Sequence, residues 1–258
     1  MSLINENLEK IVPSDSETFN VSFDKTLGNT GIEITNWLEE NNKMEASHAY
    51  GDVTYRWCFG ISGINSIGYI VNNLPENLGQ MFVKNVIDYL DIESFAVNEI
   101  KFEKLGPNHL VDDIHLRRPR FGEIIPVLED NLPTDYAKTI FYSSLWHTDK
   151  SFALNNYKIL VYLNDIEEGQ GGLTIADPVI SPSMVDNKCV LHEVGQTYKA
   201  DQIKGKEITG PAGTCASFNS HILHRANLPK QGYRYCMHLS FLLPGIDHKH
   251  DKYSINHL

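Results

Sequence analysis

The sequence predicts a mainly β protein, a sandwich or barrel of short strands with helices packed on its outside. From Ala96 onward, short apolar runs alternate with turn residues, and no long helices separate them, which argues against a doubly wound parallel sheet. Helical spacing is confined to the front third, and 258 residues, 41% of them hydrophobic, suffice for one core. We therefore expect a single domain over 1–258: a helical or irregular part at 1–95, a strand-rich core at 96–245 and a tail at 246–258.

Two helices are expected in the front third, at 31–40 and at 75–90, after a polar and weakly patterned lead-in at 1–30. The second begins with proline, which suits the first helical turn. Apolar residues recur with helical spacing in both, at Ile34, Trp37 and Leu38 in the first and at Leu78, Phe82, Val86 and Tyr89 in the second.

The strands of the core are expected where apolar runs are bounded by turn-forming segments such as Gly-Gln-Gly-Gly, Asp-Pro, Ser-Pro and Pro-Lys-Gln-Gly. Five runs meet this description: Ile159–Leu163, Leu173–Ala176, Cys189–Val194, Cys215–Phe218 and Tyr235–Leu243.

Composition excludes several classes of partner. Lys and Arg total 22 against 33 Asp and Glu, and a net charge of -11 repels phosphate backbones, so we expect neither nucleic-acid nor membrane binding. The four cysteines contain no C-x-x-C pair, and no secretory leader or apolar run of membrane-spanning length is visible. These features predict a soluble, cytoplasmic protein, of an oligomeric state that the sequence does not give.

The first chemical motif is Trp146-His147-Thr148-Asp149. In an extended segment, residues two apart point to the same face, so His147 and Asp149 can converge on one metal ion. Such H-x-D tripeptides also occur by chance, so further ligands are needed to support the site.

A third ligand is available in the segment that follows the strand at Cys215–Phe218. Two histidines, His221 and His224, lie there. Either would complete a two-histidine, one-carboxylate face, which leaves positions open on iron(II) as oxygen activation requires. We favour His224 because of the arginine that follows it.

That arginine is Arg234, ten positions after His224 and within an apolar strand. A charged residue is costly to bury there unless it is paired. It is either exposed, or paired with a structural acid, or it grips a ligand carboxylate bidentately, which arginine does better than lysine.

The segment from Trp146 to Gly245 resembles the 2-oxoglutarate- and iron(II)-dependent oxygenases, and within them most closely the phytanoyl-CoA dioxygenase-like branch. The matching pieces are WHTD at 146–149, YLNDIEEGQGGL at 162–173 and LHRANLPKQGYR at 223–234. The resemblance implies a double-stranded β-helix, a jelly-roll or cupin-like barrel. It also implies Fe(II), 2-oxoglutarate and O2 as cofactor and co-substrates, with His147, Asp149 and His224 as catalytic iron ligands and Arg234 as the partner of the distal carboxylate of 2-oxoglutarate.

Three departures from that branch concern the substrate. The segment Thr174–Pro178 replaces a Pro-Gly-Ser-His-like turn, Cys236 stands where a hydroxyl residue often assists the arginine, and YLND…GG also resembles the prolyl-hydroxylase-like branch. In the related halogenases the metal-site carboxylate is a small residue, so Asp149 favours hydroxylation over halogenation, with desaturation and ring closure still open.

Four further residues are candidates for the co-substrate pocket. Lys158 and Tyr162 share one face of a strand, although Lys158 suits solvent equally well; Thr174 and Asn227 carry groups that could bind 2-oxoglutarate or serve a turn. A basic cluster, Arg117, Arg118 and Arg120, could receive an anionic substrate but is by default a solvated loop.

The function predicted from these features is hydroxylation of an unactivated C–H bond of a small, possibly anionic metabolite, with release of succinate and CO2. Three alternatives stay open: a peptidyl or prolyl-type hydroxylase, a cupin-like metalloenzyme that does not use 2-oxoglutarate, and a decayed oxygenase that serves as a binding module. A peptide substrate needs an open groove, whereas a metabolite needs a closed pocket.

Overall fold

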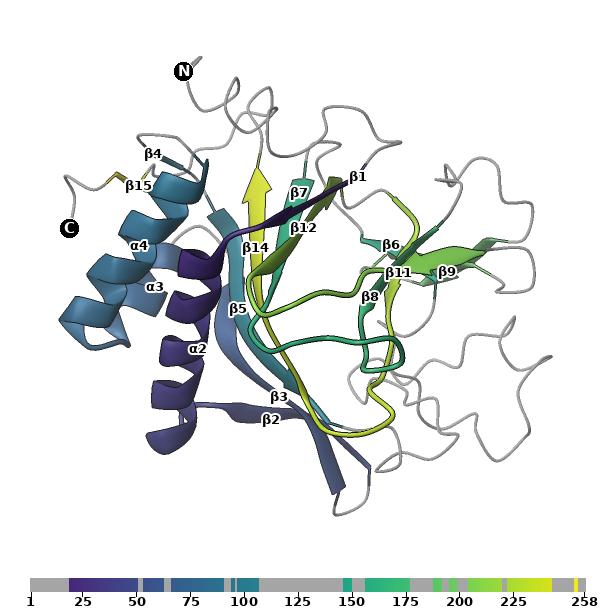
Figure 1. The fold of residues 1–258 in the computed structure, drawn as a ribbon, viewed down its shortest axis with the longest axis horizontal. Helices are drawn as coiled ribbons and strands as arrows, with labels where there is room; N and C mark the ends of the chain where they lie inside the picture. The colour runs from purple at the N-terminus through teal and green to yellow at the C-terminus, as the bar shows by residue number, and fades with distance from the viewer. Residues whose placement is uncertain are drawn as a thin grey trace.

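Two antiparallel sheets face each other, and three helices cover the outer side of the larger sheet (Figure 1). This arrangement confirms the prediction of a mainly β fold with flanking helices. None of the helices in the described ranges is long and apolar enough to cross a membrane. The computed structural model describes residues 19–50, 53–62, 66–90, 94–95, 97–106, 146–149, 156–176, 188–191, 195–198, 204–219, 222–242 and 253–254.

Both predicted helices are present, together with a shorter one. They are α2 (Lys25–Glu40), α3 (Ser66–Asn72) and α4 (Glu76–Leu90). Helix α2 begins earlier than expected, because the carboxylate of Asp24 accepts a hydrogen bond from the backbone N–H of Leu27 (2.7 Å) and caps the helix.

Glycine residues in the first half of α2 have low helix propensity, so propensity does not predict a helix there. A Cβ at Gly31 would lie 2.3 Å from Cδ2 of Leu163, so glycine lets the helix approach the sheet closely. The lead-in predicted at 1–30 is therefore wrong from residue 19 onward, where a strand and this helix lie.

The larger sheet has seven strands in the order β1-β12-β7-β14-β5-β3-β2. The part before residue 96, expected to be helical or irregular, supplies three of them. The strand run Val53–Ser62 is rich in β-branched and aromatic residues, which explains its extended form. The strands are β1 (Phe19–Phe23), β2 (Glu45–Tyr50), β3 (Val53–Ser62), β5 (Val97–Leu105), β7 (Asn156–Tyr162), β12 (Thr214–Asn219) and β14 (Arg234–Leu242).

The smaller sheet has six strands in the order β11-β8-β13-β6-β10-β9, and a separate pair joins β15 to β4. All five predicted strands are present, as β7, β8, β9, β12 and β14, with shifted ends in four of them. The remaining strands are β6 (His147–Asp149), β8 (Leu173–Ala176), β9 (Lys188–Leu191), β10 (Gly195–Tyr198), β11 (Gly205–Glu207), β13 (His224–Ala226), β4 (Ser94–Phe95) and β15 (Tyr253–Ser254).

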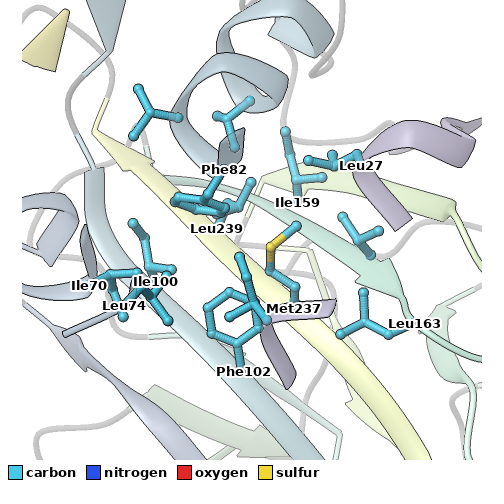
Figure 2. Packing of buried hydrophobic residues seen from close by; sticks show 14 of the residues in the cluster. Leu27, Ile70, Leu74, Phe82, Ile100, Phe102, Ile159, Leu163, Met237 and Leu239 are labelled. Carbon is cyan, nitrogen blue, oxygen red and sulfur yellow. The ribbon is translucent and has the colours of Figure 1, made fainter. Parts of the chain in front are cut away.

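The main hydrophobic core lies between the larger sheet and the helices, not between the sheets. Figure 2 shows Met237 and Leu239 of β14 beside Phe82 of α4 and Phe102 of β5. The rings of Phe82 and Phe102 meet edge to face, with centroids 6.1 Å apart. This layer fixes the larger sheet from its outer side.

The space between the sheets holds a second, smaller apolar cluster. Leu160, Tyr162 and Phe218 contribute from the larger sheet, and Leu173 and Ile175 from β8. We call this space the interior. Because strand residues alternate between faces, it receives every second residue of each strand that borders it.

Candidate active site

Three of the first four interior positions of β14 carry polar side chains, and the fourth carries a cysteine, which sets this strand apart from an ordinary core strand. They alternate with Tyr235, Met237 and Leu239, which pack with the helix-side core. Burying polar groups between two sheets is costly unless they are paired or serve a ligand. The interior residues are Arg234, Cys236, His238 and Ser240.

The predicted metal ligands come from two adjacent strands of the smaller sheet. In the antiparallel pairing of β13 with β6, His224 is the register partner of His147. Asp149 is two residues further along β6 and pairs with Gly195 of β10. Strand alternation therefore places positions 147 and 149 on the sheet face of position 224. The structure describes the backbone of His147 and Asp149 but not their side chains.

His224 is held in one orientation. Its side chain is buried, its Nδ1 lies 2.8 Å from the carbonyl oxygen of Ile222, and its ring lies against Phe218 with centroids 4.9 Å apart. Since a carbonyl only accepts, Nδ1 carries the proton and donates it to Ile222. This is the arrangement in which metal-binding histidines are usually fixed.

Arg234 is fully buried at the start of β14. Its Nη1 donates to the carbonyl of Gly171 (2.6 Å), and its Nη2 donates to Oε1 of Glu103 (2.7 Å). Among the described residues, its Nε has no acceptor. Two of the five guanidinium N–H groups are thus used, and Nε is a buried donor nitrogen available for a further acceptor.

Glu103 of β5 is the centre of a buried charge cluster. Its Oε2 accepts from Nε of Arg56 (2.7 Å) and lies 3.5 Å from Nζ of Lys101, while its Oε1 accepts from Arg234. The carboxylate of Glu103 therefore interacts with three cationic side chains, and two of these, Arg56 and Arg234, are almost completely buried.

The pKa values follow from this crowding. Burial by itself would raise the pKa of Glu103, but the attraction of Arg56 and Lys101 outweighs it and holds that pKa well below the ordinary value. Burial would likewise lower the pKa of Arg234, yet its neighbours, Glu103 among them, raise it. Glu103 and Arg234 are therefore both charged at neutral pH.

Glu103, Cys236 and His238 bring three possible ligand atoms within 4.8 Å of one another, but they form a poor cation site. The carboxylate already balances the guanidinium groups around it, and burial raises the pKa of the Cys236 thiol to about 12. A divalent cation here would meet guanidinium groups and a neutral thiol. The cluster suits an anion instead.

Among the other predicted residues, Lys158 and Tyr162 share the interior face of β7, opposite Ser240 and Cys236 of β14. The buried hydroxyl of Tyr162 donates to the carbonyl of Ile208 (2.8 Å) and accepts from the N–H of Leu173 (2.8 Å). Tyr162 thus braces the loop around Arg234.

Thr174 and Asn227 hydrogen-bond to each other, with 2.7 Å between Nδ2 of Asn227 and Oγ1 of Thr174. By alternation, Thr174 lies on the face of β8 opposite to Leu173 and Ile175, away from the interior. Their assignment to the co-substrate stays a prediction. His221 and the cluster Arg117, Arg118 and Arg120 lie outside the described residues.

Sequence reasoning missed Glu103 and Arg56. The alternation Glu99-x-Lys101-x-Glu103 in β5 looks like the solvent face of a sheet edge. A signal was nevertheless present, because the last predicted strand alternates in the same way, with Arg234, Cys236, His238 and Ser240 at every second position.

Neither a family model nor a curated protein sequence matches the chain. Solved structures do resemble it. SnoK, a non-haem α-ketoglutarate-dependent carbocyclase from nogalamycin biosynthesis, has 10% identity and a TM-score of 0.50, over 93% of this chain and 83% of SnoK. The epimerase SnoN, in complex with Fe3+, α-ketoglutarate and nogalamycin RO, has 11% identity and a TM-score of 0.51, over 93% of this chain and 90% of SnoN. At such identities the likeness concerns the fold, and the chain has the double-stranded β-helix fold of these two proteins.

Proposed function

We propose that the chain is an Fe(II)- and 2-oxoglutarate-dependent dioxygenase that hydroxylates a small anionic metabolite. The observation that carries this proposal is Arg234, a fully buried arginine in the interior of this fold whose Nε lacks an acceptor among the described residues. A structural arginine would be expected to have its donors satisfied. Nε of Arg225 also lacks an acceptor among the described residues, but Arg225 is only partly buried and lies on the other face of β13, away from the interior.

His147, Asp149 and His224 would hold the iron. The three positions share one face by strand register, which supports this assignment, and with Nδ1 of His224 bonded to Ile222, Nε2 would be its ligand atom. With 2-oxoglutarate and O2, iron supplies the oxidising chemistry that breaks an unactivated C–H bond while 2-oxoglutarate is converted to succinate and CO2. A carboxylate at position 149 favours hydroxylation over halogenation.

Arg234 would bind the distal carboxylate of 2-oxoglutarate. Its side chain is excluded from water, and a charge-assisted hydrogen bond is stronger there than at the surface. The role of the protein is to orient the co-substrate and to keep water out.

Charge in the interior supports an anionic substrate. Across strands β12, β7, β14, β5 and β3, the described interior positions carry two carboxylates, Glu99 and Glu103. They also carry four Lys and Arg side chains, in a protein whose net charge is -11. This local surplus attracts anions. The cations are Arg56, Lys101, Lys158 and Arg234.

The first test is an anaerobic titration of the protein with Fe(II) and then 2-oxoglutarate. We expect a visible metal-to-ligand charge-transfer band that saturates at one equivalent of each. If folded, iron-loaded protein shows no band, the co-substrate is wrong, and a cupin-like metalloenzyme without 2-oxoglutarate becomes the better description.

Two pairs of variants assign the residues. Arg234→Ala should abolish saturable binding of 2-oxoglutarate, whereas Arg225→Ala should not, because Arg225 stacks on Trp146 (4.8 Å) on the other face of β13. His224→Ala should lose iron, and His221→Ala should keep it. The reverse result in either pair would reject that assignment.

The substrate class is tested by succinate release from protein supplied with candidate substrates. Anionic metabolites should stimulate release above the rate without substrate, and their neutral amides should not. Stimulation by prolyl peptides alone would identify a peptidyl hydroxylase instead.

A further inference from the structure

We infer that Glu103 is a positioning residue that orients Arg234 toward the distal carboxylate of 2-oxoglutarate, and that Arg56 fixes Glu103 through its other carboxylate oxygen. This inference rests on the proposed function and adds two residues to its binding site. Neither residue touches the co-substrate in this scheme, and both act through Arg234.

The contacts of Arg234 fix the plane of its guanidinium. The carbonyl of Gly171, in the loop before β8, accepts a hydrogen bond from Nη1 (2.6 Å). Oε1 of Glu103, in β5, accepts one from Nη2 (2.7 Å). Acceptors from two separate elements define a plane, because the guanidinium is rigid and flat. Nε, the guanidinium nitrogen without an acceptor among the described residues, is thereby aimed in one direction before any ligand arrives.

Glu103 is itself held. Arg56 of β3 reaches it through both Nε and Nη2, on the oxygen that Arg234 does not use. Glu103 is 2% exposed and Arg56 is 7% exposed, so water does not compete with these bonds. The three side chains lie in the order Arg56, Glu103, Arg234 on three adjacent strands, β3, β5 and β14. A chain of buried charged hydrogen bonds of this kind restrains each member.

The positioning role and a merely neutralising role predict opposite signs. If Glu103 only balanced charge, its removal would leave the interior one unit more positive and would strengthen binding of the 2-oxoglutarate dianion. If Glu103 aims Arg234, its removal weakens binding in spite of the extra positive charge. Replacing a residue that orients a metal ligand typically costs about 10- to 100-fold in affinity, and we expect a loss in the same range for Glu103.

The experiment measures anaerobic binding to the Fe(II)-loaded protein for wild type, Glu103→Gln and the double variant Arg56→Gln/Glu103→Gln. The double variant removes one charge of each sign, so it interrupts the series of hydrogen bonds from Arg56 to Arg234 at constant net charge. It replaces Glu103→Gln in the experiment if that single variant does not fold. Lys101→Gln is the matched control: Lys101 contacts Glu103 at 3.5 Å, and its loss changes the local charge without removing a contact of Arg234.

Pyruvate supplies the second readout. It offers iron the same keto acid end as 2-oxoglutarate but has no distal carboxylate, so it cannot engage Arg234. We expect Glu103→Gln and the double variant to weaken 2-oxoglutarate binding about tenfold or more and to leave pyruvate and Fe(II) binding within about twofold. Lys101→Gln should weaken 2-oxoglutarate binding by less than about threefold.

Each other outcome has a separate meaning. Equal or tighter 2-oxoglutarate binding by Glu103→Gln, or equal losses for pyruvate and 2-oxoglutarate in a folded variant, would overturn the positioning role and leave the proposed function intact. Failure of the wild-type protein to bind 2-oxoglutarate would overturn both.

Discussion

Acidification from pH 7 to pH 5 should destabilise the protein through His238, and the variant His238→Gln should resist that loss. The His238 side chain is 16% exposed, with Nε2 at 3.2 Å from Sγ of Cys236 and 3.5 Å from Oε1 of Glu103. Burial and the nearby charge of Lys101 lower its pKa from the ordinary 6.5 to about 4, in spite of the opposing attraction of Glu103.

The sign follows from proton linkage. Because the pKa is lower in the folded state, the unfolded chain takes up a proton first, and stability falls as the pH drops from 6.5 toward 4. A pH of 5 is about 1.5 units below the pKa of the histidine in the unfolded chain. At 1.36 kcal/mol per unit, the loss in unfolding free energy is about 2 kcal/mol. Solvent reaching the exposed part of the ring makes this an upper value. Glu103 adds nothing in this window, because its stabilising charge is lost only below 4.5.

The assay is urea unfolding of metal-free protein at pH 7 and pH 5, followed by tryptophan fluorescence. The quantity of interest is the change in unfolding free energy between the two pH values, compared between wild type and His238→Gln. This double difference cancels the other histidines and any pH-independent cost of the substitution. Equal losses in the two proteins would refute a neutral, buried His238.

Three further predictions concern stability at neutral pH, measured by the same unfolding assay. Phe82→Ala should cost about 3–5 kcal/mol, because it empties the fully buried contact with Phe102. Tyr162→Phe should cost about 1–3 kcal/mol by leaving the carbonyl of Ile208 and the N–H of Leu173 without their partner. Asp24→Ala should cost about 1 kcal/mol through loss of the α2 cap. The exposed Lys84→Ala, which breaks only a surface pair with Asp88, should stay within about 0.5 kcal/mol and serves as the control for all three.

Periodicity predicted the elements that have one apolar face. Helix α4 and strands β7, β12 and β14 were found because apolar residues recur at the spacing of a helix or fill a short run between turns. The same reasoning missed the start of α2, where glycines needed for close packing resemble a loop. It also missed β1 to β3, in the part of the chain before residue 96.

The candidate site could be predicted only in part. The spacing of His147, Asp149, His224 and Arg234 was enough to suggest a metal and a carboxylate anchor. The partner of Arg234 could not be found in this way, since Glu103 lies 131 positions earlier in the chain. Pairing across such a separation is decided by the order of strands in the sheet, which local sequence does not encode.

The strand order of the larger sheet also constrains when the protein can fold during synthesis. Strand β1 at Phe19–Phe23 pairs with β12 at Thr214–Asn219, and β5 at Val97–Leu105 pairs with β14 at Arg234–Leu242. Strand β1 therefore meets its partner only after β12 has left the ribosome, whereas β2, β3 and β5 can pair with one another much earlier. Contacts so distant in sequence make folding slow, and the apolar face of α2, which packs on β7 and β14, stays partly uncovered meanwhile. Yield in a foreign host should accordingly depend on chaperone capacity and growth temperature more than on the stability of the finished fold.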